Sequence, residues 1–463
     1  MRLFSGALAS QAIVSAASFL VGLILIRHQS AELYGYYVLV TTAMLLLGGL
    51  QFSYLGPTLI IRLANRDLAG RRDAVGGMLR EQRKWIPVAG GAAAYLDGVL
   101  WWSGVLDDQI ALMVAAAILA AMATMQREFF RMVLLAYRRP LDVLKADAAY
   151  VVLLVGGAFA SSLTPVPGIA AVLTLAFATL VGGLILGRLL KRHEGWNLDG
   201  ERHILREIAP IGGWALMGSA VHWLFSQGYN YVVVGILDAR AVALVASMRL
   251  LMMPVNLMSQ GISQILLPTA SHWLRDHGPA RLLQRLTIVA ASVCALALVY
   301  SAIVWEMREW IFDEVLRRHD AHQGRILLLW SAVFVLMALR DQLAHFLTVR
   351  AQMKQLSSMT LVSAAISLMT TYAATVFLGV SGAVIGVLVG ELINVLGIAV
   401  MATLQSRRPS TDEVPAAPPT PTDARATMRL VSDRATRSLH VDRGPDTRAR
   451  LASGDGQPAT LPG

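Results

Sequence analysis

The chain has 463 residues, of which 56% are hydrophobic and only 15% are charged. Soluble domains carry about 25% charged residues, so this composition excludes an ordinary soluble protein and indicates a membrane protein. The formal net charge is +10, but the basic residues lie between long apolar runs, which argues against a nucleic-acid partner. The single cysteine, Cys294, excludes an intramolecular disulfide and a cysteine-based metal cluster.

The apolar runs predict membrane-spanning helices. A bilayer core of about 30 Å requires roughly 20 apolar residues in a helix, which satisfies its own backbone hydrogen bonds. The period-two alternation of barrel strands is missing. We therefore expect an all-α integral membrane protein with about twelve spans, near residues 6–27, 34–61, 85–105, 109–137, 142–163, 166–188, 208–235, 242–270, 287–305, 326–349, 356–378 and 381–404.

Lys and Arg are concentrated in every second loop. Arg71, Arg72 and other basic residues follow the second span, Arg138 and Arg139 follow the fourth, and the same bias follows each later even-numbered span. The positive-inside rule then predicts that these loops and both termini are cytoplasmic. The basic excess also predicts attraction to anionic membrane lipids. Residues 409–463 are rich in Pro, Ala, Thr and Ser without a long apolar run, which predicts a disordered cytoplasmic tail.

A shift of about 208–214 residues superposes three features of the sequence. The turn at 31–35 falls on 239–243, Arg127-Glu128 falls on Arg340-Asp341, and "VPGIAAVL" at 166–173 falls on "VSGAVIGV" at 380–387. The repeat predicts two six-helix halves, residues 1–200 and 201–408, in the same orientation. Such repeats are typical of secondary transporters with the substrate site between the halves.

Three stretches carry a resemblance to a known family: "LILIRHQSAELYGYYVL", "REFFRMVLLAYRRPLDVLKAD" and "LGVSGAVIGVLVGELIN". Over residues 1–405 the chain resembles the bacterial polysaccharide biosynthesis (O-antigen flippase-like) proteins of the multidrug/oligosaccharidyl-lipid/polysaccharide (MOP) exporter superfamily. The resemblance implies two six-helix bundles around a central cavity in the bacterial cytoplasmic (inner) membrane. It also implies movement of undecaprenyl-diphosphate-linked oligosaccharide to the outer leaflet, with a polysaccharide polymerase and other assembly proteins as candidate partners.

Ionisable residues inside spans are costly, about 2.5–3.5 kcal/mol each on insertion scales, and they mark functional sites. Arg127, Glu128 and Arg131 lie in the fourth span, and Arg340 and Asp341 lie at the repeat-related position in the tenth. One interpretation places the arginines in the cavity, where planar guanidinium groups would bind a diphosphate. The alternative is that each arginine neutralises its neighbouring acid and holds the two halves together. The net positive charge of the first trio favours binding.

The eighth span holds Arg249, which has no acid within four residues and is therefore the best single candidate for substrate binding. Its alternative role is to reach the outer interface. Asn256, Gln260 and Gln264 share one face by their spacing of four, which predicts either a sugar-compatible groove or hydrogen bonds between helices. Glu391 in the twelfth span is a candidate for ion coupling or for pairing with an arginine.

The sequence shows no phosphate-binding glycine loop, zinc-ligand pattern or nucleophile elbow, so we expect neither an enzyme nor a cofactor. The first functional hypothesis is a lipid-linked oligosaccharide flippase that binds its substrate through Arg127, Arg131, Arg249 and Arg340. The runner-up is a multidrug/cation antiporter of the same superfamily, which predicts a cavity dominated by acids. A membrane polymerase or glycosyltransferase would need catalytic residues in the outer segment 306–325, where Arg308, Arg317 and Arg318 keep that option open.

Overall fold

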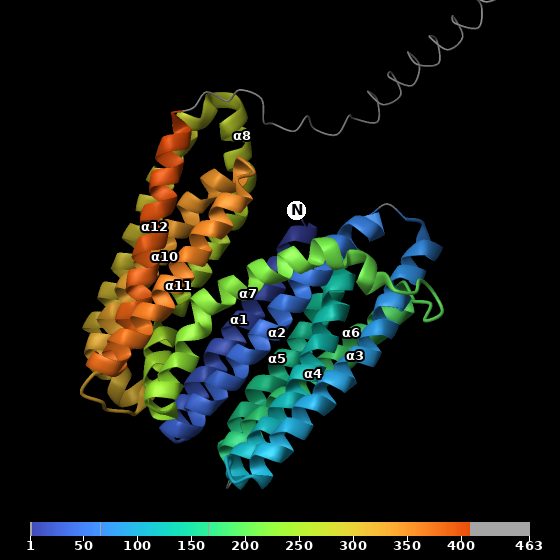
Figure 1. The fold of residues 1–463 in the computed structure, drawn as a ribbon, viewed down its shortest axis with the longest axis horizontal. Helices are drawn as coiled ribbons and strands as arrows, with labels where there is room; N and C mark the ends of the chain where they lie inside the picture. Colours follow the sequence, from blue (N-terminus) through green and yellow to red (C-terminus); the bar gives the residue numbers. More distant parts are fainter. Residues whose placement is uncertain (1, 65, 165, 408–463) are drawn as a thin grey trace, which may run out of the picture. The chain divides into compact units, whose positions relative to one another are not determined.

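The computed structural model describes residues 2–64, 66–164 and 166–407, so the predicted tail at 409–463 lies outside the described residues. The described chain is built from helices connected by short turns (Figure 1). In order they are α1 (Arg2–His28), α2 (Ala31–Ala64), α3 (Leu68–Trp102), α4 (Asp108–Ala136), α5 (Pro140–Ser161), α6 (Pro167–His193), α7 (Ile204–Ile236), α8 (Ala239–Glu306), the short α9 (Arg308–Trp310), the π-helix η1 (Ile311–Leu316), α10 (Gln323–Val349), α11 (Met353–Leu378) and α12 (Val380–Ser406).

Helix α8 contains two of the predicted spans. Its 68 residues would extend about 100 Å at 1.5 Å per residue, more than three times the thickness of a bilayer core. The helix breaks at Gly278, whose φ of 77° and ψ of 174° are not helical, and Pro279 follows. The expected loop at 271–286 is therefore helical on both sides of one sharp turn, which Figure 1 shows at the top of α8.

Nine helices among the described residues are long and apolar enough to cross a membrane, with α8 counted once. Division of α8 at Gly278, together with α3 and α7, gives the twelve predicted helices in the part of the chain that is described. Helix α3 begins at Leu68 rather than near residue 85, because its first turns are helical but rich in Arg and Lys. Hydropathy alone does not detect such a segment.

Local sequence signals begin several of the helices. Asp67, Asp107 and Asp238 accept hydrogen bonds from backbone N–H groups of the first turns of α3, α4 and α8, at 3.0, 2.8 and 2.8 Å. These are N-cap interactions, and they satisfy donors that have no partner within a helix. Pro140 and Pro167 occupy the first turns of α5 and α6, where a missing N–H costs nothing.

The described residues belong to one compact unit. Within it, α4 packs against α6, α1 against α5, and α5 against α6, whereas α8 packs against α10, and α12 against both α10 and α11. Helix α2 packs against α7 and α8 and connects the two groups. We call α1–α6 the N-terminal half and α7–α12 the C-terminal half. The start of α7 is an exception, because Ile204 and Ile208 are buried in an apolar cluster with Leu55 and Leu79 of α2 and α3.

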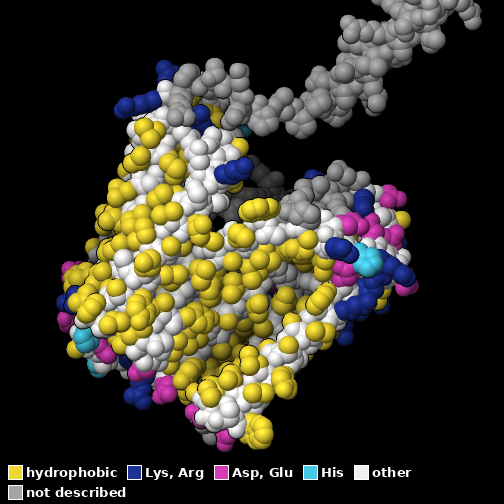
Figure 2. All heavy atoms as spheres, viewed as in Figure 1, with side chains coloured by type: hydrophobic (Ala, Val, Ile, Leu, Met, Phe, Trp, Pro, Cys, Tyr) yellow, Lys and Arg dark blue, Asp and Glu magenta, His cyan; other side chains and the backbone are white. Residues whose placement is uncertain are grey.

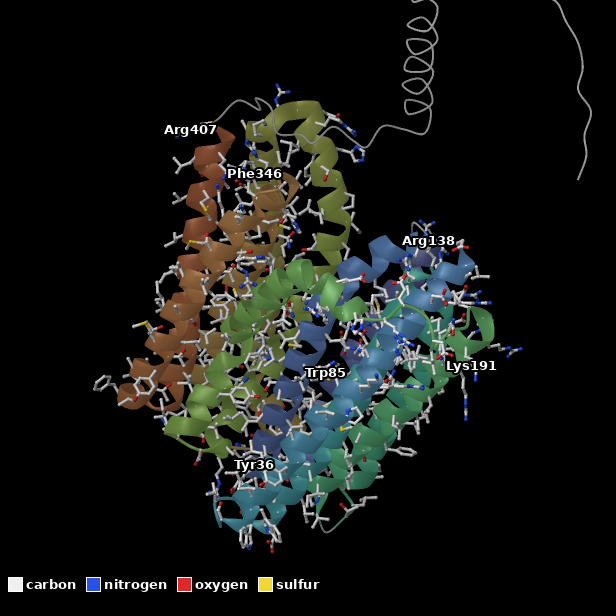
Figure 3. The ribbon with its side chains drawn as sticks, turned by 45° about the vertical axis from the view of Figure 1, so that its right-hand side comes forward. Tyr36, Trp85, Arg138, Lys191, Phe346 and Arg407 are labelled. Carbon is white, nitrogen blue, oxygen red and sulfur yellow. The ribbon has the colours of Figure 1, made fainter. Side chains whose placement is uncertain are left out.

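The surface matches a lipid environment. Hydrophobic side chains cover the sides of the helices, and charged side chains gather near the helix ends (Figure 2). Arg138, Lys191 and Arg407, from three loops predicted to face the cytoplasm, lie at one end of the helices, and Tyr36 lies at the opposite end (Figure 3). The chain is thus a multi-pass membrane protein whose basic loops share one end.

Candidate functional site

The first charged network lies inside the N-terminal half. Arg127 of α4 is only 5% exposed, and it pairs with its neighbour Glu128 at 2.6 Å and with Asp147 of α5 at 2.5 Å. The guanidinium carbon also lies 4.0 Å from the ring centroid of Tyr150. Gly182 on α6 leaves room for this arginine, since a Cβ there would lie 3.2 Å from the arginine Nε. The sequence places Arg127 correctly as an interior charge, but the structure surrounds it with partners.

Arg131, one turn further along α4, belongs to the same network. Its guanidinium lies 3.2 Å from Asp147 and 3.7 Å from Glu128, and it also contacts Ser10 of α1 at 3.3 Å. Ser10 in turn donates a hydrogen bond to the Asp147 carboxylate. Arg127, Glu128 and Arg131 carry a net positive charge by themselves, but Asp147 of α5 supplies a second negative charge, so the network as a whole is balanced.

A cavity of about 610 Å³ opens beside this network. Arg127, Glu128 and Arg131 form its charged part, and most of the remaining wall is apolar. Glu128 is the more accessible of the two acids, with 31% of its side chain exposed against none for Asp147. We call it the N-terminal cavity.

The second network lies at the repeat-related position in the C-terminal half. Arg340 of α10 donates to both carboxylate oxygens of Glu391 on α12, at 2.6 and 2.7 Å. It also donates to its neighbour Asp341 at 2.9 and 3.1 Å. Ser259 of α8 donates to the other oxygen of Asp341 at 3.3 Å. Glu391 is therefore engaged with an arginine, which is one of the two roles that the sequence left open.

The two networks have the same arrangement of one arginine between two acids, but they take the second acid from different helices. Arg127 and Arg340 are each followed by an acid, as the repeat predicts, whereas Asp147 comes from the fifth helix and Glu391 from the twelfth. Each network also remains inside one half of the protein. The expectation that these arginines hold the halves together is therefore wrong, although the expectation that they neutralise neighbouring acids is correct.

Arg249 of α8 differs from the other interior arginines. It donates a 2.7 Å hydrogen bond to the side-chain oxygen of Gln227 and contacts the hydroxyl of Tyr229 at 3.4 Å. Its guanidinium carbon lies 5.7 Å from the ring centroid of Trp330. No carboxylate among the described residues forms an ion pair with it. Its charge is thus offset by an amide and two aromatic rings, not by an acid.

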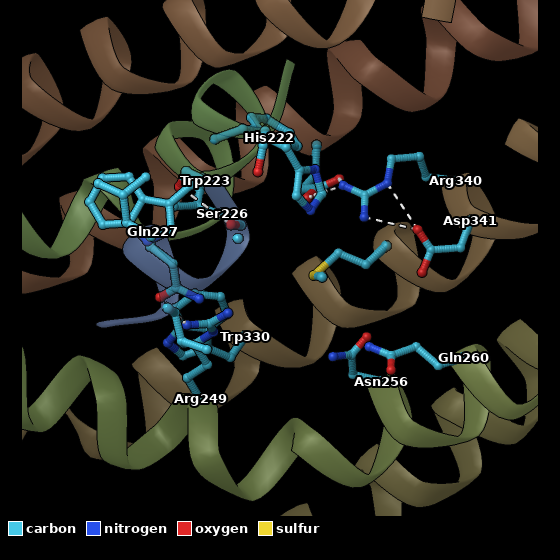
Figure 4. A pocket seen from close by; sticks show the side chains of 18 residues that line it. His222, Trp223, Ser226, Gln227, Arg249, Asn256, Gln260, Trp330, Arg340 and Asp341 are labelled. Atoms are coloured by element: carbon cyan, nitrogen blue, oxygen red, sulfur yellow. Dashed lines mark hydrogen bonds and ion pairs between the residues drawn. The ribbon is translucent and has the colours of Figure 1, made fainter. Parts of the chain in front are cut away.

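Arg249 lines a cavity of about 470 Å³ between α2, α7, α8, α10 and α12, which we call the C-terminal cavity (Figure 4). Asn256 and Gln260 lie on the same wall, as predicted, but Gln264 is not among the lining residues. Arg340, Asp341 and Glu391 close another side. The cavity as a whole is lined by two arginines and two acids, so its charge is balanced rather than dominated by acids.

The two cavities are neighbours. Leu45 and Gly49 of α2 line both of them. Candidate residues that the sequence assigned to separate helices of separate halves, including Arg127, Arg131, Arg249 and Arg340, therefore line adjoining spaces on either side of α2. The structure brings the predicted substrate-binding residues to one central region.

Sequence reasoning missed the aromatic part of the site. Trp223 and Trp330 line the C-terminal cavity, and the Tyr229 ring lies beside Arg249. Trp330 is held by a 3.0 Å hydrogen bond from its indole N–H to the carbonyl of Val245. In a chain with 10 Trp and 11 Tyr, many at membrane interfaces, no local signal marks these three. His222, a weaker sequence candidate, also lines this cavity. In the described ranges no group of three His, Cys, Asp or Glu residues is placed to bind a metal.

The comparisons with known proteins agree with this architecture. A family model described as "Polysaccharide biosynthesis protein" matches residues 110–307. The structure is similar to an inward-facing multidrug resistance MATE family transporter of the MOP superfamily, with a TM-score of 0.67 and 13% identity, covering 86% of this chain and 98% of that one. It is also similar to the lipid II flippase MurJ in an inward closed conformation, with a TM-score of 0.69 and 9% identity, covering 85% and 86%.

An outward-facing MATE structure of the same superfamily superposes less closely, with a TM-score of 0.56 at 12% identity, covering 87% of this chain and 94% of that one. No curated protein matches the sequence. At such identities a structural likeness shows the fold, and the family match adds the polysaccharide biosynthesis group. The chain is thus similar to polysaccharide biosynthesis proteins over residues 110–307, and it shares the fold of the MATE transporter and of MurJ, in agreement with the resemblance seen in the sequence.

Proposed function

We propose that this protein moves a polyprenyl-diphosphate-linked oligosaccharide from the inner to the outer leaflet of a bacterial inner membrane, with both termini in the cytoplasm. Three observations support the proposal. The matched family is one of polysaccharide biosynthesis, the fold is shared with a lipid II flippase, and two adjoining cavities with polar groups lie among the membrane-spanning helices. The cell-surface polysaccharide would be assembled from the exported units by a polymerase and other partner proteins.

Arg249 is the observation that carries the proposal. A guanidinium inside a membrane protein normally has an acid beside it, because an uncompensated charge in a low-dielectric environment is costly. Arg127, Arg131 and Arg340 follow this rule, whereas Arg249 does not within the described residues. A diphosphate would supply the missing negative charge and would accept two parallel hydrogen bonds from the guanidinium.

The surroundings of Arg249 suit a sugar next to a phosphate. Asn256 and Gln260 offer amide donors and acceptors on the same cavity wall, and Trp330 and Trp223 offer aromatic surfaces (Figure 4). In this arrangement Arg249 binds the diphosphate, the amides contact the first sugars, and the polyprenyl chain stays in the lipid. Arg127, Arg131 and Arg340 would act mainly by setting the geometry of the two cavities, since their charges are already compensated.

A multidrug antiporter is the second candidate, because the MATE structures share the fold over most of the chain. Glu128 and Asp341 have 31% and 26% of their side chains exposed, and each lines a cavity. A cation that bound to Glu128 or Asp341 would lie beside Arg127 or Arg340, and these arginines already form ion pairs with the two acids. The balanced charge of the C-terminal cavity and the unpaired Arg249 therefore favour an anionic substrate.

The test is the analysis of lipid-linked sugars from cells depleted of the protein, by extraction and mass spectrometry. We expect accumulation of a complete, unpolymerised, diphosphate-linked repeat unit that is accessible only from the cytoplasmic side. That result would also identify the glycan. Unchanged lipid-linked sugars would contradict the proposal, and ion-driven uptake of cationic drugs into vesicles would then test the antiporter.

A further inference from the structure

A third cavity, of about 390 Å³, lies at the helix ends opposite the basic loops. The turn between α1 and α2, the start of α8 and the segment that follows η1 form its walls, so both halves contribute. Residues that line it include Gln29, Ala31, Arg240, Ser247, Arg318 and Asp320. We call it the outer cavity. Neither the family match nor the two inner cavities assign a role to it.

The backbone that presents Arg318 to this cavity is unusual. Residues Ile311–Leu316 form a π-helix, and the next residue, Arg317, has a φ of 52° in the left-handed region. Short π-helical turns occur frequently at functional sites, and a left-handed residue other than Gly costs about 1–3 kcal/mol unless the surroundings impose it. Gln323 donates a 3.1 Å hydrogen bond to the Arg318 carbonyl and fixes the far side of the turn. This backbone conformation places the Arg318 side chain next to the turn between α1 and α2.

Arg318 connects the two halves without an acidic partner among the described residues. Its guanidinium donates to the main-chain carbonyl of Gln29 in the N-terminal half, and no carboxylate in the described ranges pairs with it. Burial lowers the pKa of this arginine, yet an arginine side chain stays protonated in proteins. The group is thus a half-buried cation that, among the described residues, donates to one neutral carbonyl oxygen.

The other charges around the outer cavity leave it net positive. Arg240 lies on the wall formed by α8, and its pair with Glu32 is a loose surface contact of 3.4 Å, with 71% and 47% of the two side chains exposed. Asp320 is the single acid that lines the cavity, and it is engaged with His322. The described lining thus holds two arginines and His319 against one acid, and Glu32 lies outside it, so an anion in the cavity would be stabilised.

The outer cavity also lies close to the site proposed for the diphosphate. Ser247 lines it, and Arg249 follows two residues later on α8 and lines the C-terminal cavity on a different face of the helix, with a rise of about 3 Å between them. Buried Tyr34 lies within electrostatic range of both Arg249 and Arg318, and buried Tyr229 contacts Arg249. A phosphate that leaves Arg249 toward this end of the protein would meet Arg318 next.

We propose that the outer cavity binds a phosphate group through Arg318, assisted by Arg240, and that the phosphate replaces the Gln29 carbonyl as the acceptor of the Arg318 guanidinium. A phosphate accepts two charge-assisted hydrogen bonds where the carbonyl accepts one, so the exchange is favourable. Because Gln29 and Arg318 belong to different halves, the exchange also removes a contact that holds the halves together at this end. This inference rests on the proposed function and adds a second binding step to it.

The test measures whether a phosphate compound protects the outer cavity. The full-length protein carrying Ala31→Cys and Cys294→Ser is placed in phosphatidylcholine nanodiscs, and its labelling by a charged maleimide is followed with increasing inorganic pyrophosphate. We expect pyrophosphate to slow labelling. Arg318→Gln should raise the concentration needed for protection by about tenfold or more, the value of one charge-assisted hydrogen bond, and Arg318→Lys should retain part of the protection.

A matched control is Ser103→Cys, on the exposed turn after α3 at the same end, whose labelling should not respond to pyrophosphate. If phosphatidylglycerol in the nanodiscs slows labelling and pyrophosphate does not, the site is supported and its ligand is a lipid headgroup. Labelling unaffected by either compound, or protection equal in Arg318→Gln and the parent, would overturn the inference. Neither result depends on the lipid-linked sugar analysis, so a failure of this site and a failure of the proposed function are distinguishable.

Discussion

The guanidinium of Arg249 donates a 2.7 Å hydrogen bond to the side-chain oxygen of Gln227, a neutral partner. In the same cavity, Arg340 donates two hydrogen bonds to the carboxylate of Glu391. The two arginines therefore differ in how their charge is compensated, although both line the C-terminal cavity. Arg340 is compensated by the protein itself, and Arg249 is available to compensate a ligand. Substitutions at the two positions should accordingly have different consequences.

Arg249→Gln should abolish export of the lipid-linked glycan while leaving the protein folded. The loss of a charge-assisted bidentate contact weakens binding by about tenfold or more, and the neutral glutamine leaves no unpaired charge behind. Export is measured by surface polysaccharide, and folding by size-exclusion chromatography and the melting temperature in detergent. Arg249→Lys is the matched control, which keeps the charge without the planar fork and should retain partial export. Normal export by the Arg249→Gln variant would refute the assignment.

Asp147→Asn should destabilise the protein, because Asp147 is fully buried and neutralises both Arg127 and Arg131. Removal of one partner from a buried ion pair costs about 3–5 kcal/mol, so the melting temperature in detergent should fall clearly. Lys145→Gln, on the same helix but with 74% of its side chain exposed, should leave the melting temperature unchanged. The double variant Asp147→Asn/Arg131→Gln restores the charge balance and should recover part of the loss; no recovery would mean that the hydrogen bond of Ser10 matters more than charge.

Gly35→Ala should weaken the contact between the two halves at the outer end. A Cβ at this position would lie 1.9 Å from the carbonyl oxygen of Ala239 on α8, so the helices must separate. We expect faster maleimide labelling of the thiol introduced by Ala31→Cys in the outer cavity. Gly48→Ala on the same helix is the matched control, because a Cβ there meets no atom within 4 Å. Equal labelling of the two variants would show that α2 and α8 do not form this contact in the membrane.

Gly386→Ala should disrupt the packing of α11 against α12. The added Cβ would lie 2.3 Å from the Cα of Thr371, and overpacking of this kind costs about 1–3 kcal/mol. Small residues allow such close approach between membrane helices. Gly235→Ala, where no atom lies within 4 Å of the added Cβ, should be neutral or slightly stabilising. Melting temperatures in detergent compare the two, and an unchanged value for Gly386→Ala would be inconsistent with this packing.

The sequence by itself determined the number of long helices, the separation of basic and other loops, and the repeat that relates Arg127-Glu128 to Arg340-Asp341. These features depend on composition and spacing along one helix, because the bilayer imposes length and hydropathy on every span. The same reasoning misplaced the start of α3 and the loop inside α8, since charged or Gly-Pro-containing segments can still be helical when other helices or water satisfy them.

Only the tertiary structure decided which charges are compensated and which are available. Asp147 lies twenty positions from Arg127 and Glu391 lies 51 positions from Arg340, and no periodicity links such residues because every face of these helices is apolar enough to be buried. The same holds for Arg318, whose acceptor Gln29 is 289 positions away. The sequence supplied the ionisable groups inside the membrane, and the packing of helices from distant parts of the chain assigned their partners, leaving Arg249 without an ion pair in the part of the chain that is described.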